Sequence, residues 1–407
     1  MSSDDYVLRA GTPEDFDRIN NLLTIAFHEE IDEDAVELER SVYEPARAAL
    51  AFHGDTLVGA SGSYTRDLIV PGGVVPSAHV TMVGVDATHQ RRGLLNRMMG
   101  RLLDDARRLG EPVAHLWASE GKIYQRYGYG LAAPRLSFEA GREVQLREVP
   151  ADAGRLRAVA AGDATADLRK LYEQVQPSRP GWSSRDDRWW HRMVADPKSW
   201  RGGATAIRVL VHEAAGVIDG YALWRVHNNW PGDDPTAVVV REVVAADPAA
   251  YRALWHFLLN VDLTRRVRFV FAATDEPLLY LVNEPRELNA RLADALWLRL
   301  VDVPAALAAR RYPVPVDVVL RTEDPLLPHN SGNWHLTGGP DRASCTRTDR
   351  PADLDCELGA LGAAYLGGTP LGTLAAGGRV RELTPGTLAG VDAAFRWYRA
   401  PAATEVF

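Results

Sequence analysis

The most informative segment of the chain reads Val83-Gly84-Val85-Asp86-Ala87-Thr88-His89-Gln90-Arg91-Arg92-Gly93-Leu94-Leu95. It predicts a strand that continues through a loop into a helix with a basic N-terminus. The free backbone N–H groups and the dipole of a helix N-terminus bind phosphate. Gly93 would let a pyrophosphate approach the backbone closely, and Arg91 and Arg92 would add positive charge. Taken alone, however, the spacing slightly favours a plain strand–loop–helix unit with two exposed arginines.

A second segment lies downstream and reads Leu116-Trp117-Ala118-Ser119-Glu120-Gly121-Lys122-Ile123-Tyr124-Gln125-Arg126-Tyr127-Gly128-Tyr129-Gly130. We expect a strand, a brief helix that carries Tyr124, and an aromatic–glycine turn. A phenol has a pKa of about 10, above the value of about 8.5 for a thiol, so Tyr124 could protonate a departing thiolate. Considered by itself, Tyr124 is more simply interpreted as a core residue with a satisfied hydroxyl.

The surrounding pattern predicts an α+β fold. Residues 7–9 form a first strand, and Thr12-Pro13 begins a helix whose apolar positions run to Phe27. Hairpin strands follow up to residue 85, and an amphipathic helix covers 94–109. The second half echoes this order faintly: 152–175 reads as helical apart from the region of Gly162, and strands and a further helix follow.

The composition limits the classes of function that the protein can have. A chain of 407 residues is too long for one core, so two or three domains are expected. No apolar run is long enough to span a membrane, and the net charge of −8 argues against nucleic acid and suits cationic small molecules. Cys345 and Cys356 read as free thiols without metal-ligand spacing. The acidic start lacks the features of a signal peptide, which predicts a cytoplasmic protein.

The two segments together resemble the GNAT acetyltransferase superfamily. Its Arg/Gln-x-x-Gly-x-Gly/Ala motif is matched by Gln90 to Leu95, with leucine at the last position, and its Tyr-x-x-x-Gly-[Phe/Tyr] motif by Tyr124 to Tyr129. The Eis (enhanced intracellular survival) family carries Thr-His-x-Arg-Arg-Gly-Leu-Leu, here Thr88 to Leu95. It also carries Ala-Ser-Glu-Gly-x-Ile-Tyr, here Ala118 to Tyr124. The chain is therefore similar to Eis-family N-acetyltransferases.

This resemblance implies an α+β chain with tandem GNAT-like domains, each a mixed and mostly antiparallel sheet with helices, followed by a domain like sterol carrier protein. Residues 1–145 would form the catalytic GNAT domain with the acetyl-CoA site, and 146–298 a second GNAT-like domain without the CoA motif. Residues 299–407 would supply the C-terminal carboxylate. The resemblance also implies a homohexamer.

The resemblance implies functional residues as well. Tyr124 would be the general acid, and the carboxylate of Phe407 the general base. Phe27 and Glu29 would line the acceptor pocket, where the penultimate Val406 replaces an acidic residue and so reduces the negative charge. No metal is required. The acetyl-CoA site would comprise Val83, Gly84, Val85, Gln90, Arg91, Arg92, Gly93, Leu94 and Ser119.

The expected activity is transfer of acetyl from acetyl-CoA to primary amines of cationic small molecules, such as aminoglycosides, or to lysine side chains. A CoA-sensing or apolar-ligand-binding protein without turnover is the alternative, and a different acyl group is a third possibility. The acidic residues at 29–34 read either as a solvated helix face or as the rim of a cationic pocket. His115 reads as a core histidine, and His89 as either a phosphate contact or an exposed spectator.

Overall fold

The computed structural model describes residues 5–148, 154–228 and 236–407. They divide into two compact units. Unit 1 comprises Met1–Ala133, Ala295–Pro401 and Val406–Phe407, and unit 2 comprises Pro134–Asp294 and Ala402–Glu405. This division into units does not test the domain boundaries that we expect after residues 145 and 298, so those boundaries stay predictions.

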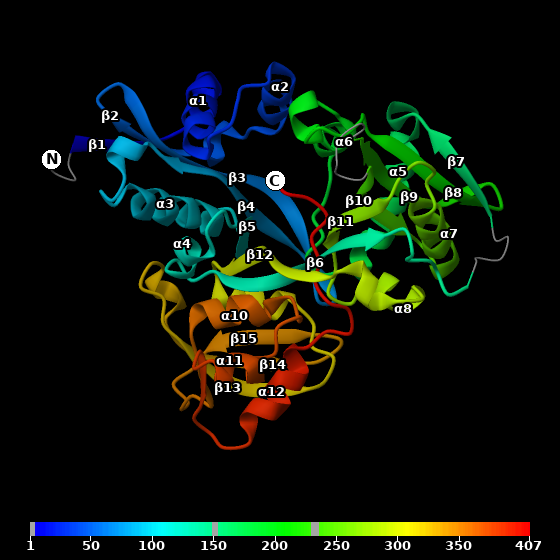
Figure 1. The fold of residues 1–407 in the computed structure, drawn as a ribbon. Helices are drawn as coiled ribbons and strands as arrows, with labels where there is room; N and C mark the ends of the chain where they lie inside the picture. Colours follow the sequence, from blue (N-terminus) through cyan, green and yellow to red (C-terminus); the bar gives the residue numbers. More distant parts are fainter. Residues whose placement is uncertain (1–4, 149–153, 229–235) are drawn as a thin grey trace. The chain divides into compact units, whose positions relative to one another are not determined.

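The first part of unit 1 is built on a mixed sheet (Figure 1). Its strands lie in the order β1-β2-β3-β4-β5-β12. The contacts are antiparallel except between β4 and β5, which run parallel. The strands are β1 (Tyr6–Ala10), β2 (Ala49–His53), β3 (Thr56–Val70), β4 (Gly73–Val85), β5 (Val113–Trp117) and β12 (Arg291–Leu300), of which the part from Ala295 belongs to this unit.

Helices cover both faces of this sheet, as the alternation along β2 shows. Ala51 belongs to the apolar cluster that contains Met98 of α3, whereas Phe52 belongs to the cluster that contains Ile19 of α1. Successive side chains of a strand point to opposite faces, so α1 and α3 lie on opposite sides. The helices are α1 (Phe16–Phe27), α2 (Glu33–Val42), α3 (Leu94–Arg108) and α4 (Gly121–Gln125).

The start of α1 follows the sequence closely. Thr12 caps a short 3₁₀ turn, Pro13–Asp15, that leads into the helix. The Asp15 carboxylate accepts a hydrogen bond from the backbone N–H of Thr12 at 2.8 Å and pairs with Arg9 of β1 at 2.6 Å. The predicted helix start is therefore confirmed, and the Arg9–Asp15 pair ties it to the edge strand.

The C-terminal part of unit 1 is a second mixed sheet with helices. Its strands lie in the order β15-β14-β13-β16-β17. Arg310 is fully buried and donates hydrogen bonds to the carbonyls of Tyr365 and Phe395 at 2.6 and 2.8 Å, which fixes the ends of two helices. The elements are α9 (Val303–Ala309), β13 (Val316–Thr322), β14 (Gly332–Gly338), β15 (Ala343–Arg347), β16 (Leu354–Cys356), α10 (Leu358–Tyr365), α11 (Leu371–Ala376), β17 (Val380–Glu382) and α12 (Thr387–Phe395).

Unit 2 contains a sheet in the order β6-β11-β10-β9-β8-β7. Only its β10–β11 contact is parallel among the pairings of the described residues. This repeats the single parallel contact of the first sheet. The elements are β6 (Gly130–Gly141), of which the part from Pro134 belongs to this unit, β7 (Arg155–Val159), α5 (Ala161–Val175), α6 (Asp187–Val194), β8 (Arg208–Ala214), β9 (Val217–His227), β10 (Ala237–Ala245), α7 (Pro248–Leu259), β11 (Arg266–Ala272) and α8 (Leu278–Leu281).

The helix expected over 152–175 is wrong in its first part. Arg155–Val159 is the strand β7, and the helix begins at Ala161. Residues 152 and 153 lie outside the described residues. The strand pairs antiparallel with β8, and Leu156 packs against the apolar core of unit 2, so tertiary pairing outweighs the local helical pattern.

The tail residues that belong to unit 2 are held by a buried ion pair. Glu405 lies 3.3 Å from the guanidinium of Arg185, which also pairs with Glu242 at 2.6 Å. The hydroxyl of Tyr221 donates to the same Glu242 carboxylate at 2.5 Å. A buried arginine shared by two carboxylates fixes the chain just before its last two residues.

Candidate active site

The site begins at an irregularity in β4. The β3–β4 register shifts between Ala60 and Gly62, opposite Gly84 and Thr81, so β4 has one residue more than β3 there. Met82, at this point, has a positive φ of 53°. A bulge of this kind bends a strand and re-aims its side chains.

The strand β4 also separates from β5 close to this bulge. Their parallel register comprises Ser77↔Val113, Ala78↔Ala114 and His79↔His115 within the described residues, and it stops there. The backbone of β4 beyond His79 is therefore outside the β5 ladder. Val83, Gly84 and Val85, predicted to bind acetyl-CoA, lie in this part of β4.

The predicted phosphate loop forms as the sequence indicates. Gly93 is the N-cap of α3 with φ 77°, and Leu94 is the buried first residue of that fifteen-residue helix. A Cβ at Gly93 would meet nothing within 4 Å, so the backbone here is open to an approaching group. Gln90 and Arg91 are exposed on the same loop. The free N–H groups of the first turn of α3 could hold a pyrophosphate.

The two arginines of the loop have different surroundings. Arg92 donates to the Tyr6 hydroxyl at 2.8 Å and to the Thr88 carbonyl at 3.0 Å, so it braces the loop against β1. Arg91 is exposed and has a positive φ of 60°. Arg91 therefore presents its charge to solvent, whereas Arg92 also has a structural role that the sequence did not reveal.

Tyr124 lies on α4 in a largely apolar environment. Its side chain is 5% exposed and belongs to an apolar core cluster that also contains Val80 of β4. Val83 packs against this cluster. Burial raises the pKa of Tyr124 to about 12, with a smaller contribution from Tyr127. The phenol therefore keeps its proton at neutral pH, as a general acid requires. Ser119 is exposed in the turn between β5 and α4.

The last residue of the chain packs on β4 and β5. The Thr81 hydroxyl donates a hydrogen bond of 3.3 Å to a main-chain oxygen of Phe407. The Phe407 ring lies edge-to-face against His79 and His115, with centroid distances of 4.8 and 5.1 Å. The structure thus brings the predicted base next to the β4 bulge and the predicted CoA-binding strand.

The two histidines below Phe407 are fully buried, as expected for His115. Their ring centroids are 4.0 Å apart. Burial lowers the pKa of His115 to about 3, and it lowers the pKa of His79 well below its ordinary value, with the neighbouring His115 adding to the effect. Both rings are therefore neutral at physiological pH. Within the described residues, His115 Nε2 is buried without a hydrogen-bond partner.

The predicted acceptor residues lie at the C-terminal end of α1. Phe27 is its last residue and is 45% exposed, and Glu29 is exposed just beyond it. Gly84 allows α1 to pack closely on β4, because a Cβ there would lie 2.8 Å from Leu23. In the acidic stretch that follows, Asp32 caps α2, which favours the solvated-helix interpretation.

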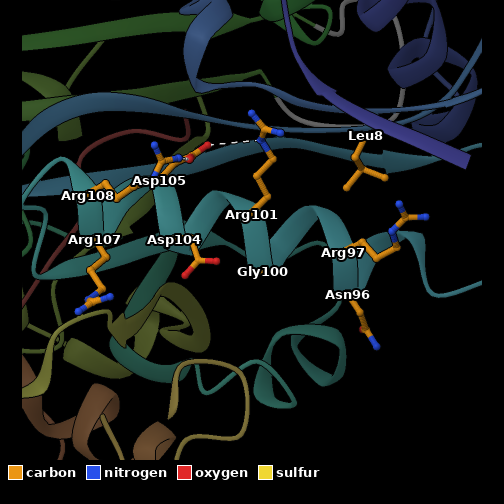
Figure 2. A pocket seen from close by; sticks show the side chains of 9 residues that line it. All are labelled: Leu8, Asn96, Arg97, Gly100, Arg101, Asp104, Asp105, Arg107 and Arg108. Atoms are coloured by element: carbon orange, nitrogen blue, oxygen red, sulfur yellow. Dashed lines mark ion pairs between the residues drawn. The ribbon is translucent and has the colours of Figure 1, made fainter. Parts of the chain in front are cut away.

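A hollow of about 760 Å³ lies along the exposed face of α3 (Figure 2). Two of its arginines are paired within the helix: Arg101 lies 3.7 Å from Asp105, which Arg108 also contacts. The predicted charged face of this helix is confirmed. None of the predicted site residues lines this hollow.

Within residues 5–148, 154–228 and 236–407, no group of three or more His, Cys, Asp or Glu is arranged to hold a metal ion. None of the helices in these ranges is both long and apolar enough to cross a bilayer.

Comparison with known families agrees with the architecture. A model described as an acetyltransferase (GNAT) domain matches residues 7–132, and another with the same description matches 181–300. A sterol carrier protein domain matches 303–403. The chain thus has tandem GNAT domains followed by a sterol-carrier-protein-like domain, as the resemblance implied.

Individual relatives are similar over most of the chain. An uncharacterised N-acetyltransferase of Streptomyces avermitilis is 43% identical over 90% of this chain and 90% of its own length. The N-acetyltransferase Eis of Mycobacterium tuberculosis is 35% identical over 84% of each. The crystal structure of Eis1 from Mycobacterium abscessus is 32% identical, covers 98% of this chain and 100% of its own, and superimposes with a TM-score of 0.86. This chain belongs to the Eis family of GNAT N-acetyltransferases.

Proposed function

We propose that this enzyme transfers acetyl from acetyl-CoA to primary amines of cationic small molecules, aminoglycoside-like compounds among them, or to lysine side chains. The observation that carries the proposal is the position of the terminal Phe407 on β4, hydrogen-bonded to Thr81 beside the bulge. A chain end is usually frayed and takes no part in function. The packing of Phe407 against the strand that is predicted to bind acetyl-CoA therefore supports a functional role for its carboxylate.

The residues present fit acetyl-CoA as the donor. The backbone of β4 beyond His79 is outside the β5 ladder, and the backbone at Gly93 is open at the N-terminus of α3. The pyrophosphate would lie at Gln90 to Leu94, and the pantetheine arm along Val83 to Val85, with Ser119 near its end. Arg91 adds exposed positive charge.

The proton transfers follow from ordinary acid–base chemistry. A primary amine with a pKa of about 10.4 is mostly ammonium at neutral pH, so its nucleophilic form requires loss of a proton. The Phe407 carboxylate would bind the ammonium and accept that proton, directly or through water. The amine nitrogen then attacks the thioester carbonyl, which the N–H of Val85 could polarise. The carbon–sulfur bond breaks, and Tyr124 protonates the leaving thiolate. The attacking nitrogen then loses its second proton to give the neutral amide, and that proton restores the Tyr124 phenol.

The acceptor class rests on charge. Glu29 is exposed near the end of α1, and Val406 is 49% exposed and uncharged. We infer that cationic acceptors are preferred. Because Val406 is uncharged, the pocket would carry less negative charge than it would with an acidic penultimate residue. A homohexamer and a cytoplasmic location are further parts of the proposal. The hexamer rests on the family resemblance, and the location rests on the sequence.

The test is a panel of amines assayed by CoA release, with polyamines, aminoglycosides and lysine peptides as acceptors. Binding of CoA to the same preparation is measured by calorimetry as the control. We expect turnover with at least one cationic acceptor. CoA binding without turnover on any amine would instead support a sensor, and competition by longer acyl-CoAs would show whether acetyl is the preferred group.

A further inference from the structure

We propose that Thr81 is a positioning residue that holds the terminal carboxylate of Phe407 in place to accept a proton. The inference rests on the proposed role of that carboxylate and adds the group that orients it. The hydroxyl of Thr81 lies 3.3 Å from the Phe407 oxygen, and the side chain is half-buried on β4 next to the bulge. A hydroxyl that donates to a carboxylate favours its charged form.

The His79–His115 pair also helps to hold the Phe407 carboxylate in place. The two imidazoles form a pocket for the Phe407 ring, with which both make edge-to-face contacts. Such contacts have a preferred geometry, so they restrict the orientation of the ring and hence of the carboxylate on the same residue. A terminal residue without an aromatic ring could carry the same carboxylate but would not be held in this way.

Hydrogen bonds inside the pocket fix the imidazoles themselves. His79 Nδ1 lies 3.1 Å from the carbonyl of Ser77, which can only accept, so this nitrogen carries the proton. The Ser77 hydroxyl donates to the Val113 carbonyl at 3.3 Å, and His115 Nδ1 lies 2.8 Å from the same hydroxyl oxygen. The Ser77 hydroxyl thus holds the His115 ring, and the Ser77 carbonyl sets the tautomer of His79.

The charges around the pocket favour an anionic terminus. His79 and His115 are the titratable groups of β4 and β5 at this point, and both are neutral. Behind them, Arg66 of β3 lowers the pKa of both rings by its charge, so its positive potential reaches the pocket. Arg47 acts on His79 in the same sense but is paired with the buried Glu111 at 2.6 Å. Positive charge near the rings favours the ionised form of a neighbouring carboxylate.

The test uses two acceptors of the same shape, a primary alkylamine and the corresponding O-alkylhydroxylamine. The first is an ammonium ion at neutral pH and needs a base. The second is already uncharged, so its nitrogen can attack without first losing a proton. With Thr81→Val we expect kcat for the alkylamine to fall roughly tenfold, which is part of the rate enhancement that a positioned base supplies. The kcat for the hydroxylamine should change less than about twofold. Thr81→Ser, which restores the hydroxyl, should recover most of the activity.

Phe407→Leu, which keeps the carboxylate but removes the ring, should show the same acceptor-selective loss. The matched control is Thr56→Val, the same substitution at an exposed position of β3, which should change neither rate. Equal losses of both rates in Thr81→Val would indicate general damage and overturn the proposal, as would an unchanged alkylamine rate.

Failure of the underlying function would look different. If a chain extended beyond Phe407 still acetylates the alkylamine at the wild-type rate, the carboxylate is not the base, whatever Thr81→Val does. If the extension abolishes that activity and Thr81→Val is silent, the carboxylate is the base but Thr81 does not position it.

Discussion

Replacing Tyr124 by phenylalanine removes one hydroxyl group from a side chain that is 5% exposed and otherwise packed among apolar neighbours. The ring keeps its shape, so the core around α4 should be preserved. Positioned general acids contribute about 10²- to 10⁴-fold to a rate, which corresponds to roughly 3–5 kcal/mol of barrier. We expect kcat to fall at least 100-fold while KM for acetyl-CoA stays within about twofold.

The pH dependence of the wild-type enzyme provides a second check on the same residue. The acid form of Tyr124 is the active one, and burial raises its pKa to about 12. Activity therefore should not fall through ionisation of Tyr124 as the pH rises from 7 to 10, which is the range in which an unperturbed phenol would begin to titrate.

The assay is steady-state CoA release with a fixed amine, at pH 6 to 10, for wild type and Tyr124→Phe. Thermal unfolding of both proteins is the control, and the two midpoints should agree within a few degrees. A Tyr124→Phe enzyme with a third or more of the wild-type kcat would refute the assignment of Tyr124 as the general acid.

Two further predictions come from the structure, and a third comes from the family resemblance. Gly84→Ala places a Cβ 2.8 Å from Leu23 and should lower the free energy of unfolding by about 1–3 kcal/mol in urea titrations; an unchanged midpoint would contradict the close packing of α1 on β4. Arg9 lowers the pKa of the buried Asp15 carboxyl from 3.8 to about 2, so its contribution is present above pH 4 and is lost as the pH falls through about 2. Asp15→Asn should therefore cost about 1–2 kcal/mol at pH 7, a value reduced because Arg9 is 40% exposed, and little near pH 2; an equal cost at both pH values would show that the charge is not responsible. Light scattering should give about six times the 44.7 kDa mass of one chain, and a mass of one or two chains would exclude the hexamer.

Much of the first GNAT domain could be predicted because its sequence signals are local. The apolar spacing of α3, the glycine at its start and the Thr12-Pro13 helix signal all depend on neighbours within a few residues. The structure places each of them where the sequence indicates. The family resemblance then supplied the proposed roles of Tyr124 and Phe407, which no periodicity could have indicated.

Long-range contacts account for what the sequence did not reveal. Thr81 and Phe407 are 326 residues apart, and Thr81 is an ordinary β-branched residue within a predicted strand. The bulge at Met82 depends on the register with β3, which has no signature in the local pattern. Arg92 turns toward Tyr6, 86 residues away, although its local context suggested either a phosphate contact or an exposed side chain.

The β7 error has the same origin. Arg155–Val159 follows a helical pattern locally but is a strand, because β8 pairs with it. The imidazole pocket likewise forms only when β4 and β5 meet at His79 and His115. Each of these features is decided by strand pairing between distant parts of the chain.

The most direct test of the account is the rate of alkylamine acetylation by a protein with a few residues appended after Phe407. The same residues appended before Met1 provide the matched control. We predict that the C-terminal extension lowers kcat by about 100-fold or more, while CoA affinity and thermal stability stay at wild-type values. Activity close to that of the control would show that the terminal carboxylate is not the base.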